Sequence, residues 1–295
     1  MHILDALELY LVQLGADGRS PHTRGLASRY VKLLAAWLAS EGHSGEIAEI
    51  DHQTLARFLV APCATQRADG KPRKATTCNV LRSVLRTFFG YLHNAGEMRA
   101  NPARLVRLAR TAPPPPRSLS EAEEQRLLAV LDQAESWVER RDRVLFRLLH
   151  ATGIRLGSAL ALRVEDLDLE AGEAWLRKTK GDRPERVFLH PETQELLLCW
   201  VGEVGEGYLF PGRQDDPLSA RHVHRRFRQL LERAEIDRPA SVHWLRHAFA
   251  ERLYRRTGDI LLVQQALLHR SLASTLVYAR GDSGRVRDAI RSLKC

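Results

Sequence analysis

The chain has 295 residues, of which 44% are hydrophobic, and this length and composition favour a folded protein of two domains over a disordered one. No apolar run is long enough to cross a bilayer, and acidic residues interrupt the apolar start, which predicts an amphipathic helix and not an export signal. The four cysteines form no CxxC pair, so we expect reduced thiols in a cytoplasmic protein without structural zinc.

Positive charge is concentrated in one part of the chain. The formal net charge is +9, and residues 71–110 contain nine basic residues and one acidic residue. Such a surface attracts polyanions and releases counterions from DNA on binding, although charge alone fits a solvated helix face equally well. The uneven distribution favours nucleic acid, and the candidate DNA-binding residues of this stretch are Lys71, Arg73, Lys74, Arg82 and Arg86.

The pattern of apolar residues predicts a small helical domain over residues 1–110. Apolar residues recur at helical spacing over residues 1–14, 21–40 and 75–95, and Asp51 predicts the N-cap of a helix that runs to Val60. In the 75–95 helix, Arg82 and Arg86 are four apart and share one side. The predicted inward residues of that helix are Val80, Leu81, Val84, Leu85, Phe88 and Phe89.

Four consecutive prolines, Pro113–Pro116, predict a semi-rigid linker over residues 111–118, followed by a second domain over 119–295. Ser120 and Glu123 have capping-box spacing, and residues 142–152 predict an apolar helix closed by glycine. Alternating segments at 175–180 and 186–189 flank a Gly-Asp-Arg-Pro turn, which predicts a β-hairpin. From residue 220 the pattern is helical again. The predicted fold is therefore mainly α with a small β-sheet.

Three short motifs in the second domain carry residues suited to phosphate chemistry. His243 and Arg246 are three apart on one predicted helical face, with Ser241 as a candidate cap, so a proton carrier lies beside a planar cation that fits phosphate oxygens. Taken alone, this segment fits a capped surface helix. The upstream motif is Ala-Thr-Gly-Ile-Arg-Leu, which ends in Arg155 and Leu156. The downstream motif is Leu-Leu-His-Arg-Ser, and its His269 lies nine residues before Tyr278.

In order and spacing, these motifs resemble those of the tyrosine recombinase (phage integrase) family. The resemblance covers most of the second domain, and the segment from Asn101-Pro102 to Ser120 is similar to that family's domain junction. It implies a helical, SAM-like core-binding domain over residues 1–110 that clamps DNA, and an α+β catalytic domain over 119–295. Because no further domain precedes the helical one, we expect an Xer-like site-specific recombinase.

The resemblance implies that Tyr278 attacks the scissile phosphate and becomes linked to the 3′ phosphate, which frees a 5′ hydroxyl. Arg155 and Arg246 clamp the non-bridging oxygens and offset the charge of the transition state. Without the resemblance, a tyrosine near the end of a chain is more often a packing residue, and Arg155 fits a helix-dipole contact. No metal, ATP or other cofactor is expected.

Four further basic residues receive implied roles. Lys180 protonates the leaving 5′ oxygen, although strand alternation does not separate it from Lys178. His243 helps to move the tyrosine proton, and His269 donates a hydrogen bond to a phosphate oxygen. We expect His247, the last residue of the HxLRH motif, to serve packing or to support its neighbours.

Two positions depart from the family pattern. Ser158 stands where the family has an acidic residue three positions after its first arginine, and Leu268 stands where glycine precedes the last histidine. Because of Ser158, one alternative interpretation is a catalytically weak DNA-binding protein of the same fold. A type IB topoisomerase, which shares the tyrosine–phosphate chemistry, is the other alternative.

The implied partners are double-stranded DNA and other recombinase subunits. Exchange between two duplexes takes four cleavages, so the resemblance implies a homo-tetramer, or a hetero-tetramer with a related recombinase, in the nucleoid and not at a membrane. We expect the amphipathic tail, residues 282–295, to pack on a neighbouring subunit, and Arg221 and Arg225, together with Arg228, to follow backbone phosphates. Neither the target sequence nor the biological role follows from these residues.

Overall fold

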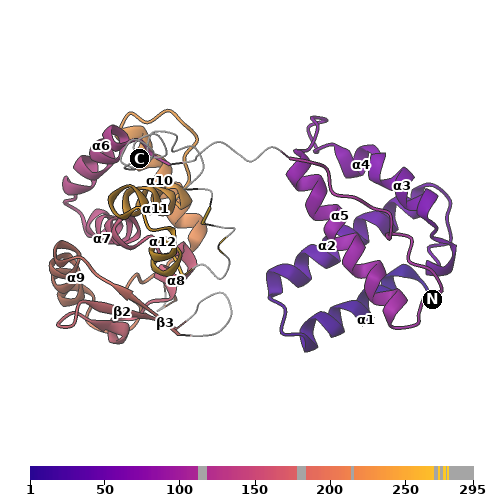
Figure 1. The fold of residues 1–295 in the computed structure, drawn as a ribbon, viewed down its shortest axis with the longest axis horizontal. Coiled ribbons are helices and arrows are strands. Elements are labelled where there is room, and N and C mark those ends of the chain that lie inside the picture. Colours follow the sequence, from indigo (N-terminus) through magenta and orange to yellow (C-terminus); the bar gives the residue numbers. More distant parts are fainter. Residues whose placement is uncertain are drawn as a thin grey trace, which may run out of the picture. The chain divides into compact units, whose positions relative to one another are not determined.

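The computed structural model describes residues 1–111, 118–177, 184–213 and 216–268, together with 272, 275, 276 and 278. The chain divides into two compact units, Met1–Pro113 and Pro114–Cys295 (Figure 1). Each unit has its own hydrophobic core. The division falls within the predicted linker. Within the described residues, no helix has both the length and the apolar character needed to span a membrane.

The first unit is built mainly of helices. Ser20 accepts a hydrogen bond from the backbone N–H of Thr23, and Asp51 accepts one from Thr54, so side-chain caps begin two of its helices. Its elements are α1 (Ile3–Ala16), α2 (Pro21–Ser40), a 3₁₀ turn (Ile47–Glu49), α3 (His52–Val60), α4 (Pro62–Thr65) and α5 (Ala75–Asn94).

Helix α5 buries a narrower face than the sequence predicts. Its buried residues are Leu81, Leu85, Phe88, Phe89 and Leu92. Val80, predicted to face inward, is 40% exposed. It lies at the edge of the apolar face of α5, whose buried residues recur every three to four positions.

The side chain of Asn79, on α5, binds the backbone of the segment that follows this helix. It donates to the carbonyl oxygen of Ala109 and accepts from the same residue's N–H, at 2.9 and 2.8 Å. The first unit is thereby held together up to the start of the linker.

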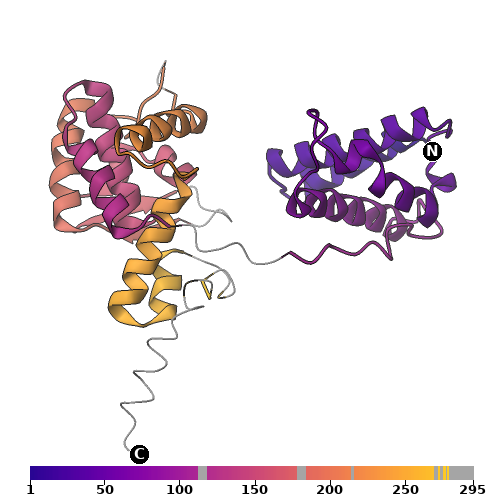
Figure 2. The ribbon, with the colours of Figure 1, turned by 90° about the horizontal axis from the view of Figure 1, so that it is seen from above.

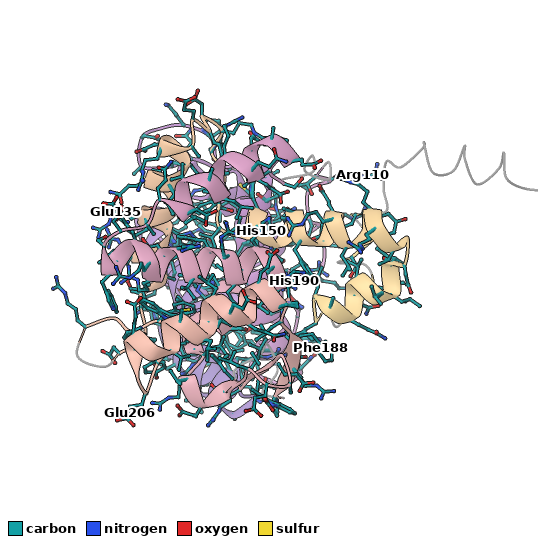
Figure 3. All side chains as sticks on the ribbon, turned by 90° about the vertical axis from the view of Figure 1, so that its left-hand side faces the viewer. Arg110, Glu135, His150, Phe188, His190 and Glu206 are labelled. Carbon is teal, nitrogen blue, oxygen red and sulfur yellow. The ribbon has the colours of Figure 1, made fainter. Side chains whose placement is uncertain are left out.

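The second unit is built around α7, which packs against α6, α9 and α11 (Figure 3). Capping boxes begin α6 at Ser120 and α7 at Ser136, so α7 starts five residues earlier than predicted. The elements are α6 (Glu121–Asp132), α7 (Trp137–Thr152), α8 (Leu156–Ala161), a 3₁₀ turn (Val164–Asp166), β1 (Leu167–Asp168), β2 (Glu173–Leu176), β3 (Glu185–Phe188), α9 (Pro191–Val204), α10 (Ala220–Arg233), α11 (His243–Thr257) and α12 (Ile260–Ala266).

The small sheet is antiparallel in the order β1-β2-β3, and β2 and β3 are the strands of the predicted hairpin. Its turn, residues 178–183, lies outside the described residues. The register pairs Trp175 with Arg186 and Leu176 with Glu185. Since Leu176 is buried, this register places Glu185 on the core side of the sheet, whereas Arg186 and the 69%-exposed Phe188 lie on the outer face.

Helices α11 and α12 lie side by side (Figure 2). The prediction that Ser241 caps α11 is wrong: the N-cap is Val242, which makes no side-chain capping bond, and Ser241 contributes only its backbone oxygen to Trp244. Helix α11 therefore begins at His243 without a side-chain cap, and Gly258, with φ of 73°, ends it.

Candidate active site

Arg246 joins two of the sequence motifs to α11. Its side chain is buried, and its guanidinium donates to the carbonyl oxygens of Gly153 and Leu267, each at 2.6 Å. Burial and the charge of Arg155 lower its pKa to about 10, against opposing effects of Tyr278 and Glu185. Arg246 thus stays protonated at neutral pH, and it ties the end of α7 to the end of α12.

Gly153 sets the position of Arg155. With φ of 63° it ends α7 in the left-handed conformation, and a Cβ there would lie 2.4 Å from Cδ1 of Phe249. The chain then turns into α8, whose N-cap is the half-buried Arg155. Because Arg155 lowers the pKa of both His243 and Arg246, these three basic residues belong to one electrostatic site.

Tyr278 lies in the same site. Its hydroxyl makes a 2.8 Å hydrogen bond with Nδ1 of His247, and its ring packs against a small apolar cluster that includes Val263 and Leu267. Burial raises the pKa of Tyr278 to about 12; Arg246 lowers it and Glu251 raises it further. At neutral pH the phenol is therefore protonated.

The two histidines of α11 have their rings in contact, and the ring of Tyr278 contacts the second of them. The rings of His243 and His247 meet edge-to-face with centroids 4.7 Å apart, and the ring of Tyr278 lies 5.5 Å from that of His247. Burial, followed by the charges of Arg246 and Arg155, lowers the pKa of His243, so this imidazole is neutral at neutral pH. Sequence reasoning predicts a packing or supporting role for His247, yet this is the imidazole that contacts the phenol. The role predicted for His243 stays a prediction.

Several predicted site residues lie outside the described residues: Lys178, Lys180, His269 and the tail 282–295. Their roles remain predictions.

The candidate DNA-binding residues of the first unit fall into two groups. Arg73 is half-buried and donates to the backbone oxygens of Gln66 and Cys63, and Arg82 donates to Asn79, so both support the local fold. The exposed members are Lys71, Lys74 and Arg86.

On α10, the exposed Arg221 and Arg225 border a surface hollow of about 850 Å³. Its other lining residues are Ser219, His222, His224 and Arg228, and Arg225 reaches His222 at 3.0 Å. A hollow lined almost entirely by basic and imidazole groups suits a polyanion.

Comparison with known proteins decides the family. The model of the phage integrase family matches residues 117–285. The chain belongs to this family of tyrosine recombinases. Among its relatives are two proteins called tyrosine recombinase XerC: that of Xylella fastidiosa (strain M23) is 30% identical over 268 residues, 90% of this chain and 88% of that protein. That of Xanthomonas campestris pv. campestris (strain B100) is 29% identical over 283 residues, 95% and 85% of the two proteins.

Solved recombinases share the fold. The XerH site-specific recombinase in its pre-cleavage complex with difH matches with a TM-score of 0.74 at 24% identity, over 98% of this chain and 84% of that one. Lambda integrase, in a tetramer bound to a Holliday junction, matches with a TM-score of 0.69 at 20% identity, over 92% and 78%. The mainly helical fold with a small sheet is thereby confirmed.

The two departures from the recombinase pattern have different structural outcomes. Leu268 keeps the backbone that suits glycine, with φ of 53°, so the chain tolerates a strained leucine there. Ser158 is buried on α8, three residues after Arg155, and places no carboxylate there.

A carboxylate that sequence reasoning missed comes from the sheet. The Oε2 atom of Glu185 is shielded from solvent and has no hydrogen-bond partner among the described residues, and its charge acts on Arg246. Strand register could have signalled it, because Glu185 shares a face with the buried Val187.

Proposed function

We propose that this recombinase cuts and rejoins DNA at specific sites through a 3′-phosphotyrosine intermediate on Tyr278, without metal or ATP. One observation carries the proposal: the hydroxyl of Tyr278 is hydrogen-bonded to α11 one residue from Arg246, whose buried guanidinium it also affects electrostatically. A phenol and a fixed cation therefore lie close enough to act on one phosphate, which supports the nucleophile role of Tyr278.

The chemistry balances with the residues of this chain. Arg155 and Arg246 hold the non-bridging phosphate oxygens while the Tyr278 oxygen bonds to phosphorus and the bond to the 5′ oxygen breaks. The phenolic proton of Tyr278 leaves at the same time, and the family pattern gives its uptake to His243. Lys180 supplies the proton that the leaving oxygen takes up, and His269 donates to a phosphate oxygen. Since one phosphoester replaces another, the reverse attack by a 5′ hydroxyl rejoins the strand with no external energy source.

The substrate and assembly follow from the same proposal. The XerH neighbour is described as bound to its difH substrate, and a lambda integrase neighbour as a tetramer bound to a Holliday junction. We extend both features to this chain: double-stranded DNA in the cytoplasm and nucleoid, bound by a tetramer of identical or related subunits whose tails, residues 282–295, pack on their neighbours.

The test is covalent capture of DNA. A duplex that the full chain selects from a random library is rebuilt with a nick beside the cleavage position, so that the released short strand diffuses away and rejoining stops. We expect a DNA–protein adduct that survives denaturation and is absent with Tyr278→Phe, while both proteins bind the duplex equally.

Two alternatives predict different products. The buried Ser158, which stands where the family has a carboxylate, favours a catalytically weak DNA-binding protein; such a protein would bind the duplex and form no adduct. A topoisomerase would relax supercoiled plasmids irrespective of sequence and exchange no strands between them.

A further inference from the structure

The hydrogen bond between Tyr278 and α11 bears on how the nucleophile loses its proton. Of the two α11 imidazoles, the one at 2.8 Å from the hydroxyl is that of His247. His243 lies one turn earlier, and its ring meets that of His247 edge-to-face at a centroid distance of 4.7 Å. The phenol is thus in direct contact with a group that accepts protons near neutral pH.

We propose that His247 is the general base of strand cleavage: its Nδ1 atom takes the phenolic proton of Tyr278 as the tyrosine oxygen attacks the phosphate. This inference rests on the proposed phosphotyrosine mechanism and reassigns one step of it. His243, next to Arg246 and within the field of Arg155, is left to bind the phosphate.

The proton balance is simple. Before attack, His247 is neutral with its proton on Nε2, and the hydroxyl of Tyr278 donates to Nδ1. As the oxygen–phosphorus bond forms, the proton moves to Nδ1 and the bond to the 5′ oxygen breaks, with Lys180 protonating that oxygen. In rejoining, the imidazolium of His247 returns the proton to the departing phenolate.

The surroundings of the phenol make such a base necessary. Tyr278 is half-buried, and burial together with Glu251 opposes its ionisation more than Arg246 favours it. A free phenolate is therefore scarce at neutral pH, and attack has to be coupled to proton transfer. The His247 contact places a proton acceptor 2.8 Å from the hydroxyl.

The experiment combines two histidine variants with a more acidic nucleophile. Single-turnover adduct formation on the nicked duplex is measured for the full chain, His247→Ala, His247→Asn and, as the matched comparison on the same helix, His243→Ala. Each is made with Tyr278 and with a fluorinated tyrosine whose phenol ionises more readily. Asparagine retains a hydrogen-bonding atom near the Nδ1 position but takes up no proton, and DNA affinity and thermal unfolding are recorded for every variant.

We expect both His247 variants to bind DNA within about twofold of the unmodified chain and to form adduct about 100-fold more slowly or worse. The fluorinated tyrosine should restore about tenfold or more of that loss, because a more acidic phenol depends less on a base. The His243→Ala variant should be slow and gain nothing from fluorination.

Three results overturn the inference. The first is a normal rate of adduct formation in His247→Ala, and the second is a normal rate in His247→Asn, which would mean that His247 only positions the phenol. The third is that the fluorinated tyrosine fails to speed up the His247 variants, or speeds up His243→Ala alone. The near-isosteric asparagine variant serves if alanine impairs folding. Absence of adduct from the unmodified chain removes the proposed function itself, whereas a slow His247 variant beside an active parent leaves that function standing.

Discussion

Single residues in this protein serve the fold and the site together, and Arg246 does so most clearly. Its guanidinium satisfies two backbone carbonyl oxygens that end separate helices, and it still carries N–H donors for a phosphate. A lysine offers a point charge without the planar fork, so it cannot satisfy both carbonyls and a phosphate in the same way.

We therefore expect Arg246→Lys to lower the free energy of unfolding by about 1–3 kcal/mol, the cost of leaving a buried carbonyl unsatisfied. It should also slow adduct formation about 100-fold or more. Thermal unfolding and the nicked-duplex assay measure the two effects, and Arg255→Lys, an exposed position on the same helix, is the control. Unchanged stability would mean that the two carbonyl bonds do not hold the helix ends together.

Sequence reasoning goes far at this scale but stops at side-chain contacts. Ordered motifs identify Arg155, Arg246 and Tyr278, and the structure brings all three into one electrostatic site. They do not identify the partner of the tyrosine, because helical spacing tells which residues share a face of α11 but not which imidazole meets a side chain arriving from residue 278.

At the scale of elements, a short strand supplies a half-buried carboxylate where α8 has none. Glu185 lies at the start of β3 with one shielded oxygen, and its charge favours protonated Arg246. Arg155 and Arg246 repel each other, and the negative charge of Glu185 offsets part of that repulsion.

We expect Glu185→Gln to slow adduct formation about tenfold, the effect of about one pKa unit of lost stabilisation, with DNA affinity maintained or raised. Ser158→Glu in the same chain should restore part of the rate, since it places a carboxylate on α8 instead. Glu173→Gln, which removes a carboxylate paired with Arg186 on the neighbouring strand, is the control. Normal cleavage by Glu185→Gln, or no recovery in the double variant, contradicts the role given to this carboxylate.

The start of α6 makes stability depend on pH. Glu123 is a member of the capping box and accepts from Arg238. Burial raises its pKa, but the bonds from Arg238 and Ser120 lower it more, from 4.5 to about 2. Because the folded-state pKa is the lower one, the contribution to stability is complete above pH 4.5 and is lost as the pH falls toward 2.

We accordingly expect Glu123→Gln to unfold at a lower temperature than the unmodified chain at neutral pH. The two should converge as the pH falls through that window, in thermal unfolding followed by circular dichroism. Glu121→Gln, exposed in the same turn, should show neither effect. A Glu123→Gln deficit that persists at the acid end would assign the effect to packing rather than to charge.

The element predictions succeed where a local signal exists and fail where packing decides. Periodicity and caps predict α1, α2, α3, α5 and α6, and alternation around a turn predicts the β2–β3 hairpin. Strand β1 has only two residues, too few for any period, and α7 begins after Ser136 because a second capping box precedes its apolar run. Ser241 is a typical capping residue, but Val242 occupies the cap position.

At the scale of the whole molecule, each unit carries its own basic surface. Exposed lysines and arginines lie on and before α5 in one unit and on α10 in the other. Such contacts with phosphates raise affinity and its salt dependence without reading sequence.

We expect combined replacement of Lys71, Lys74 and Arg86 by glutamine to weaken DNA binding. It should also flatten the slope of log affinity against log salt by about 0.9 for each DNA phosphate that the variant no longer neutralises. A control replaces Arg19, Arg24 and Lys32, three exposed basic residues elsewhere in the same unit. Fluorescence anisotropy over a salt series measures both, and equal slopes for the two triple variants would show that residues 71–86 are not a DNA surface.

The central claim is that one phenol oxygen becomes bonded to DNA, and mapping that bond tests it most directly. Trypsin cleaves after Arg270 and Arg280 and releases a peptide, residues 271–280, in which Tyr278 is the only tyrosine. Mass spectrometry of the trapped adduct should find the 3′ phosphate on Tyr278 in this peptide, with a free 5′ hydroxyl on the released strand. A phosphate attached to any other residue, or through the 5′ end of the DNA, would contradict the account.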